Sequence, residues 1–176
     1  MISLKGDKLE QQTKSPATET KRQFEDTKGA ESELKAVIEG INAAFRARDL
    51  NKLKSFYAKD VVAYDMPTPL SFKGIDSYLE SWKTALDMMS DMGPFETAED
   101  KYFVGQDIGI YHALCRMTGT LTKNNEKIDS WARYTGVFKK SEGKWLIVHE
   151  HFSVPIDMEK EKPAWSLKPE SASIRH

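Results

Sequence analysis

The segment KWLIVHEHFSVP, from Lys144 to Pro155, reads as a β-strand that carries three ionisable side chains in succession. His149, Glu150 and His151 suggest three alternatives: a catalytic cluster, a metal site, or polar positions on the surface of a sheet. Successive side chains of a strand point to opposite faces. We therefore expect Glu150 on one face of the sheet and both histidines on the other.

The segment closes a run of predicted strands. After Gly93 the pattern predicts strands at 95–105, 108–122, 127–140 and 144–154, separated by the turn sequences GQDIG, KNNEK and KSEGK. Each turn sequence is short, so neighbouring strands are expected to pair in antiparallel fashion.

Helices are predicted before these strands. Apolar spacing indicates helices at 31–48 and 76–89. Between them lie a short helix, with Asp49 as its N-cap, and the strand DVVAYDM. This order of elements predicts an α+β fold in which helices pack on one face of a strongly bent antiparallel sheet.

The pairing of the last three strands predicts two different sheet faces. A two-residue turn at Asn124 and Asn125 would place Arg116 opposite Arg133, and a turn at SEG would place Arg133 opposite His151. The face expected beneath the helices is apolar apart from Glu150 and includes Tyr111, Cys115, Tyr134 and Phe152. The other face is aromatic and cationic and includes His112, Arg116, Trp131, Arg133, Trp145, Ile147, His149 and His151.

Acid–base chemistry is the reaction type that the residues favour. A glutamate on an apolar, covered face has its pKa raised by desolvation, as a proton-shuttling carboxyl requires. Asp65, at the end of the first strand, is expected to project towards the same cavity as Glu150. The expected walls are aromatic: Tyr64, Trp82, Tyr111, Tyr134 and Phe152. Two structural readings stay open, namely Asp65 as a turn residue and Glu150 as the partner of a buried Tyr or Arg.

Other chemistries have less support. Zinc binding by His112, His149 and His151 is conceivable, but the sequence lacks the H-E-x-x-H spacing, and we expect neither a metal nor a cofactor. Cys115 is predicted to be an inert core thiol. The sequence contains no G-x-S-x-G elbow and no Gly-rich phosphate loop.

Composition narrows the possible partners and the location. The 176 residues are enough for one ordinary domain, and a net charge of −1 gives no reason to expect nucleic acid as a partner. No apolar run is long enough to cross a bilayer, and the first residues do not resemble a secretory signal. With one cysteine, the expectation is a reduced, cytoplasmic protein.

Polar segments are expected at both ends of the domain. Residues 1–28 are predicted to form a flexible or loosely helical arm, because they lack apolar periodicity. Residues 29–157 would form the domain. Residues 158–176 would form a C-terminal tail, with Trp165 as an anchor.

Two segments resemble the SnoaL-like branch of the nuclear transport factor 2 superfamily. They are VIEGINAAFRARDLNKLKSFYAKDVVAYDMPTP, residues 37–69, and RYTGVFKKSEGKWLIVHEHFSVP, residues 133–155. The superfamily also includes ketosteroid isomerase, limonene epoxide hydrolase and the kinase II association domain. The resemblance implies a cone-shaped fold with a cavity between a bent sheet and helices, usually dimerised through the outer sheet face.

The resemblance also bears on individual residues. Asp65 matches the general base of ketosteroid isomerase, but the oxyanion-binding tyrosine of that family falls near Ile41, which has no hydroxyl. Steroid isomerisation is therefore not expected. The pocket arginines of the kinase association domain fall at Gly136 and Phe152, so that anion site is not carried over.

Two functions remain in view, and the sequence leaves open whether the protein is an enzyme. The first is a small-molecule pocket protein with cofactor-independent acid–base chemistry, of the isomerase, cyclase, dehydratase or hydrolase type, on an apolar or aromatic carbonyl compound. In it Asp65 is the base and Glu150 a second acid. The alternative is a non-catalytic ligand-binding or oligomerisation module. Its homodimer would form through the face that carries His112, Arg116, Trp131, Arg133, His149 and His151.

Overall fold

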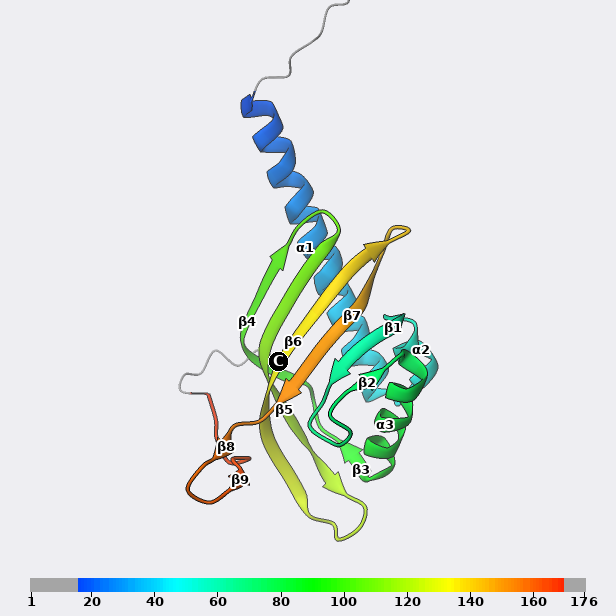
Figure 1. Cartoon of the computed structure of the whole chain (residues 1–176), viewed down its shortest axis with the longest axis vertical. Helices are drawn as coiled ribbons and strands as arrows, with labels where there is room; N and C mark the ends of the chain where they lie inside the picture. Colours follow the sequence, from blue (N-terminus) through cyan, green and yellow to red (C-terminus); the bar gives the residue numbers. More distant parts are fainter. Residues whose placement is uncertain (1–15, 170–176) are drawn as a thin grey trace, which may run out of the picture.

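The computed structural model describes residues 16–169, with side chains from residue 28 onward. Three helices precede most of the strands (Figure 1). The helices are α1 (Pro16–Arg46), α2 (Leu50–Lys54) and α3 (Ile75–Asp87). The strands are β1 (Tyr57–Tyr64), β2 (Phe72–Lys73), β3 (Met89–Met92), β4 (Glu96–Val104), β5 (Ile108–Leu121), β6 (Lys127–Ser141), β7 (Lys144–Ser153), β8 (Ile156–Asp157) and β9 (Lys162–Pro163). None of the helices in this described part is long and apolar enough to span a membrane.

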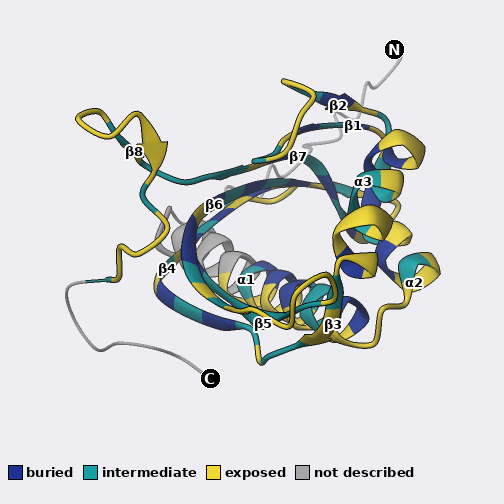
Figure 2. Ribbon diagram, turned by 90° about the horizontal axis from the view of Figure 1, so that it is seen from below, coloured by how far each residue is buried: buried dark blue, intermediate teal, exposed yellow. Residues whose placement is uncertain are grey.

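The main sheet curves around α1, with α2 and α3 beside it (Figure 2). Its strand order is β2-β1-β7-β6-β5-β3, and β4 also pairs with β5. The predicted α+β class and bent sheet are confirmed. The sheet is mixed rather than wholly antiparallel, because β1 runs parallel to β7. The small β8–β9 sheet extends outward from the rest of the fold (Figure 2).

Helix α1 packs its apolar stripe against the inside of the sheet. Leu34 is fully buried, and Ile38 and Phe45 are also in the core. Leu34 lies over Gly109 of β5 so closely that a Cβ at Gly109 would lie 2.8 Å from Leu34 Cδ2. A Cβ at this position would require the fully buried Leu34 side chain to shift, so glycine favours the close approach of helix and strand.

The helix starts earlier than the apolar pattern indicates. It begins at Pro16 rather than near residue 31, so residues 16–28 of the expected arm are helical, and α1 extends past the sheet at this end (Figure 1). Residues 1–15 of the arm and 170–176 of the tail lie outside the described residues. Asp49 caps α2 as predicted, since its carboxylate accepts a hydrogen bond from the Lys52 N–H.

The β5–β6 register differs from the prediction by two residues. Arg116 pairs with Trp131 instead of Arg133, because the connection is a longer loop in which the Leu121 N–H donates to the Glu126 carbonyl. By the same shift, His112 pairs with Thr135. A shift of two residues leaves every side chain on its predicted face.

The β6–β7 register differs from the prediction by one residue at the turn and by two residues beyond a bulge. Glu142 and Gly143 form a tight two-residue turn with positive φ angles of 50° and 77°, which pairs Lys140 with Trp145. The extra residue Val148 then shifts the register, so that Gly136 pairs with Glu150.

The bulge divides β7 into two halves, and only the first half faces the opposite way from the prediction. Before it, Trp145 and Ile147 point into the core, so their predicted place on the outer face is wrong. After it, Glu150 points inward and His151 is exposed, as predicted. The tight turn and the bulge each shift the register by one residue in the same direction, so Arg133 pairs with Ser153 instead of His151. A total shift of two residues returns Glu150 and His151 to their predicted faces.

The packing of α1 against the sheet can be tested by truncating Leu34. Leu34→Ala is expected to lower the free energy of unfolding by about 2–5 kcal/mol, because it removes buried methyl groups and leaves a cavity above Gly109. Chemical denaturation measures the change. Ser32→Ala, on the exposed side of α1, should change stability by less than about 0.5 kcal/mol. Equal effects of the two substitutions would contradict this packing.

Candidate functional site

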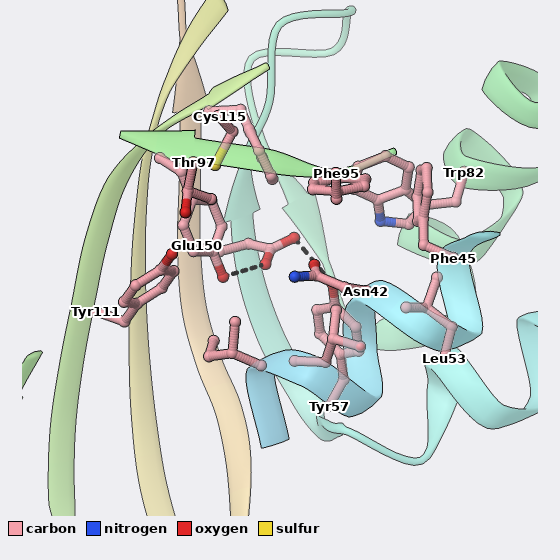
Figure 3. Close-up of a pocket in the computed structure, with 14 residues that line it drawn as sticks. Asn42, Phe45, Leu53, Tyr57, Trp82, Phe95, Thr97, Tyr111, Cys115 and Glu150 are labelled. Atoms are coloured by element: carbon pink, nitrogen blue, oxygen red, sulfur yellow. Dashed lines mark hydrogen bonds between the residues drawn. The ribbon is translucent and has the colours of Figure 1, made fainter. Parts of the chain in front are cut away.

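A cavity lies between the inner face of the sheet and the helices (Figure 3). Its free volume, measured as the space open to the centres of water molecules, is about 50 Å³, which accommodates a few waters or a small part of a ligand. The lining residues are Ile38, Ile41, Asn42, Phe45, Leu53, Tyr57, Trp82, Phe95, Thr97, Tyr111, Cys115, Tyr134, Glu150 and Phe152. Most of them are apolar or aromatic, and Glu150 is the carboxylic acid among them.

Glu150 is held in place by two tyrosines. It is 1% exposed, and its Oε1 and Oε2 accept hydrogen bonds of 3.1 Å from the Tyr57 and Tyr134 hydroxyls, respectively (Figure 3). Gly136, which pairs with Glu150, makes room for this arrangement: a Cβ there would lie 2.5 Å from the Tyr134 hydroxyl. The glycine lets the tyrosine lean across the strand to reach the carboxyl.

Burial sets the proton affinity of Glu150. Desolvation raises its pKa, hydrogen bonds from Tyr78, Tyr57 and Tyr134 lower it in part, and the nearby Asp65 charge raises it again. The resulting pKa is about 7. Near neutral pH the carboxyl therefore populates both protonation states, which is the property that a general acid or base requires.

Trp82 supplies a hydrogen-bond donor to the same cavity. Its indole Nε1 is buried and has no hydrogen-bond partner among the described residues, although it lies close enough to the Tyr57 hydroxyl to lower the pKa of that phenol slightly. Its ring packs edge-on against Phe45 at 4.7 Å and against Phe152 at 6.0 Å, distances between ring centroids. A buried donor without a partner costs free energy, so a ligand oxygen that accepts from it would be favoured.

Asp65 is linked to Glu150 but does not line the cavity. Its Oδ2 accepts a 3.0 Å hydrogen bond from the Tyr78 hydroxyl, and its Oδ1 accepts one of 2.7 Å from the Met66 N–H. Burial raises its pKa, against the effects of these two donors and of His151. Asp65 instead lines a groove beside the ends of β1 and β7.

The predicted aromatic walls are mostly found in the cavity. Trp82, Tyr111, Tyr134 and Phe152 all line it. Tyr64 does not: it is 45% exposed and packs against His149 and His151 on the outer face. The reason is strand alternation, since Ala63 of β1 points inward and its neighbour Tyr64 must point outward.

The polar residues predicted for the outer face do not form one cluster. Arg116 forms ion pairs with Glu96 and Asp129. His149 Nδ1 hydrogen-bonds to the Val62 carbonyl, and His112 stacks on Phe103. Trp131 is buried, whereas Arg133 and His151 are exposed. The described residues contain no group of three or more His, Cys, Asp or Glu side chains arranged to hold a metal ion.

Several cavity residues were not identified from the sequence. Ile38, Ile41 and Phe45 belong to the helix predicted at 31–48, and Tyr57 begins β1, three residues before the predicted strand DVVAYDM. Their spacing predicts burial but does not separate a cavity wall from solid core. Cys115 also lines the cavity, where burial raises the pKa of its thiol to about 12 and keeps it protonated at neutral pH.

A family comparison identifies the fold. The model of the SnoaL-like domain matches residues 34–157. The chain belongs to the SnoaL-like family. Among solved structures, an NTF2-like protein of unknown function from Pseudomonas putida KT2440 is 33% identical, with a TM-score of 0.71 over 81% of this chain and 98% of that one. The predicted cone-shaped NTF2-like fold is thus confirmed. No curated protein matches the chain.

Two more distant structures show the range of proteins on this fold. A putative calcium/calmodulin dependent protein kinase II association domain from Xanthomonas campestris is 25% identical, with a TM-score of 0.63 over 71% of this chain and 87% of that one. A putative scytalone dehydratase from Novosphingobium aromaticivorans is 11% identical, with a TM-score of 0.66 over 73% of this chain and 86% of that one. The second likeness shows the fold alone.

The buried carboxyl predicts a specific dependence of stability on pH. The pKa of Glu150 is about 7 in the folded protein, against 4.5 in the ordinary state, so the folded protein binds more protons between these values. Glu150 thus stabilises the fold below about pH 4.5, and this contribution is lost as the pH rises through 7, a change on the order of 3 kcal/mol. The titratable groups that face it are those of Tyr57, Asp65, Tyr78, Cys115 and Tyr134.

The measurement compares wild type with Glu150→Gln by denaturation from about pH 4 to about pH 8. The free energy of unfolding of wild type minus that of Glu150→Gln should decrease as the pH rises from about 4.5 to about 7. Glu80→Gln, at an exposed position of α3, serves as the control and should show a constant difference. A constant difference for Glu150→Gln as well would contradict the raised pKa.

Proposed function

We propose that this protein binds a small apolar or aromatic carbonyl compound in the cavity and moves a proton on it, with Glu150 as the acid–base group and without a cofactor. One observation carries the proposal: a buried carboxyl with a pKa of about 7 shares an apolar cavity with the unpartnered donor Trp82 Nε1. A base and a donor for an oxygen are the two groups that enolisation of a carbonyl compound requires.

The chemistry follows from these two groups. The Glu150 carboxylate takes a proton from the carbon next to the carbonyl, and the electron pair of that C–H bond moves towards the carbonyl oxygen. Trp82 N–H donates to this oxygen and stabilises its developing negative charge. Glu150 then returns the proton to the same or another carbon, or the electrons expel a leaving group. The first outcome is an isomerisation and the second an elimination.

Tyr57 and Tyr134 position the carboxyl rather than react. Burial raises the pKa of both phenols well above their usual value, so they stay protonated and act only as donors. Each holds one carboxyl oxygen. The position of Glu150 is therefore fixed before a substrate binds, which lowers the entropic cost of reaction.

The substrate would enter between α1 and β4. A second depression at this place shares Ile38, Asn42, Phe95, Thr97 and Tyr111 with the cavity. Lys35, Arg46 and Asp100 lie around it. The cavity is small, so only the reacting part of the substrate would fit inside, and the remainder would lie in this polar entrance.

The neighbours named as a dehydratase and as the dehydrochlorinase LinA carry the names of elimination reactions, which also begin or end with proton transfer.

Hydrogen exchange tests the proposal without knowledge of the natural substrate. Small cyclic and aromatic ketones, such as cyclopentanone and acetophenone, are incubated with the protein in D₂O, and loss of the protons next to the carbonyl is followed by NMR. Wild type is expected to accelerate the exchange of at least one of them. Glu150→Gln should lower this acceleration by about 100-fold or more, because the amide cannot accept the proton.

Trp82→Phe tests separately the role of the Trp82 N–H as a hydrogen-bond donor to the carbonyl oxygen. It keeps an aromatic wall but removes the N–H donor, so exchange should slow by about 10- to 100-fold while Glu150 retains its pKa. The control Glu80→Gln, outside the cavity and its entrance, should exchange at the wild-type rate. Wild-type protein without acceleration on any ketone of the panel, or Glu150→Gln with unchanged activity, would contradict the acid–base proposal.

We also propose that two copies associate through the outer face of the sheet. The β4–β5 outer patch, made of Phe103, Ile108 and Ile110, is exposed, and Phe103 pairs with Ile110 across the two strands. Contiguous exposed apolar side chains are typical of an interaction surface. The likeness to a putative association domain also favours assembly, and with it the non-catalytic alternative if the cavity proves inactive.

Light scattering tests this assembly. The wild-type mass is expected to be twice the 20.0 kDa of one chain. Ile110→Glu should give the monomer, because a charge in the centre of the patch would be buried without a partner. Leu70→Ser, which changes an exposed apolar residue between β1 and β2, should leave the mass unchanged. A wild-type monomer would contradict the proposal.

A further inference from the structure

We propose that Tyr78 and Asp65 form a proton relay between Glu150 and solvent, which ends in a groove separate from the substrate entrance. The inference rests on the proposed function, since it gives the base of that reaction a route for its proton. It assigns Asp65 a role other than that of the base expected from the resemblance. It also has a test that needs no substrate.

The two carboxyls lie on the same face of neighbouring strands. Glu150 of β7 pairs with Ala63 of β1, and Asp65 lies two residues beyond Ala63. Residues two apart on a strand share a face, so Asp65 is a diagonal neighbour of Glu150, at a distance that one intervening side chain can span.

Tyr78 of α3 is the side chain between them. It is fully buried, and its ring packs against those of Phe72 at 5.2 Å and Tyr57 at 6.0 Å. Its hydroxyl donates to Asp65 Oδ2 at 3.0 Å and is also close enough to the Glu150 carboxyl to lower its pKa. One hydroxyl therefore interacts with both acids.

The far end of the relay is open to water. Asp65 lines a groove of about 690 Å³ together with Tyr64, Ser71, His151 and Trp165. The groove shares no lining residue with the entrance between α1 and β4. A proton could thus leave through the groove while a substrate fills the entrance.

The transfer is balanced and requires no ionised tyrosine. Protonated Glu150 gives its proton to the Tyr78 oxygen as the Tyr78 O–H gives its own proton to Asp65 Oδ2. Glu150 becomes a carboxylate, Tyr78 remains a phenol and Asp65 becomes a carboxylic acid that releases the proton to the groove. Burial and the nearby acids raise the pKa of Tyr78 well above its usual value, so the two protons must move together.

A pH jump on the free protein tests the relay. The carboxyl C=O band of Glu150 is followed by stopped-flow infrared spectroscopy, and the Glu150→Gln spectrum is subtracted to isolate it. Tyr78→Phe and Asp65→Asn are expected to slow the protonation of Glu150 by about tenfold or more, because the first removes the bridging hydroxyl and the second the proton acceptor. The amide oxygen introduced by Asp65→Asn can still accept the hydrogen bond from Tyr78, so that variant tests proton uptake rather than geometry.

Tyr57→Phe is the matched control. It too removes a buried hydroxyl beside Glu150, but the hydroxyl that donates to Asp65 is that of Tyr78 and not that of Tyr57. Both Tyr→Phe variants should raise the pKa of Glu150, and only Tyr78→Phe should slow its protonation. Equal protonation rates in wild type, Tyr78→Phe and Asp65→Asn would overturn the relay and indicate that protons arrive through water in the cavity.

Two features of the experiment distinguish failure of the relay from misfolding of a variant and from failure of the proposed function. If Tyr78→Phe does not fold, as thermal unfolding would show, Asp65→Asn at a partly exposed position decides the question. Ketone exchange is not used here. If the protein exchanges no ketone but protonation is slowed in both variants, the proposed function is contradicted and the relay is supported. If ketone exchange is normal and protonation is not slowed, the relay is contradicted and the proposed function is supported.

Discussion

The burial of the Glu150 carboxyl is the constraint on which the rest of the site depends. An ionisable group without water is costly unless its oxygens accept hydrogen bonds. Here Tyr57 from β1 and Tyr134 from β6 each donate to one of its oxygens, and the Tyr78 hydroxyl from α3 lies close enough to lower its pKa. The glutamate therefore links β1, β6 and α3 at one point. The cavity around it exists because these elements meet at a polar group rather than closing into solid core.

The position of Glu150 depends in turn on the backbone of the β6–β7 hairpin. The tight turn at Glu142 and Gly143 alone would send Glu150 to the outer face, and the bulge at Val148 alone would do the same. Together they keep Trp145 and Ile147 in the core before the bulge and Glu150 in the cavity after it. One hairpin thus supplies both core residues and a cavity acid on the same strand.

The same hairpin shows how far the sequence can predict this protein. Period and turn residues were sufficient for the order of elements and for separating Glu150 from His149 and His151. They were insufficient for Trp145 and Ile147, because a bulge leaves no mark on the apolar pattern. Trp82 was expected as a wall, but its unpartnered N–H depends on how α3 packs against the sheet, which local spacing does not encode. Asp65 reached its groove for the same reason: its direction is set by Tyr78 and the Met66 N–H.

A comparison within the molecule separates a functional reading of Glu150 from a structural one. Carboxyls that hold elements together here are paired with cations: Arg116 lowers the pKa of Asp129, and Lys140 with Trp145 lowers that of Glu33. Such pairing fixes the charged form and makes the group a poor proton carrier near pH 7. Glu150 is held instead by phenol hydroxyls, which position it yet leave its pKa at about 7. With an unpartnered donor in the same cavity, this is the arrangement expected of a group that gains and loses a proton.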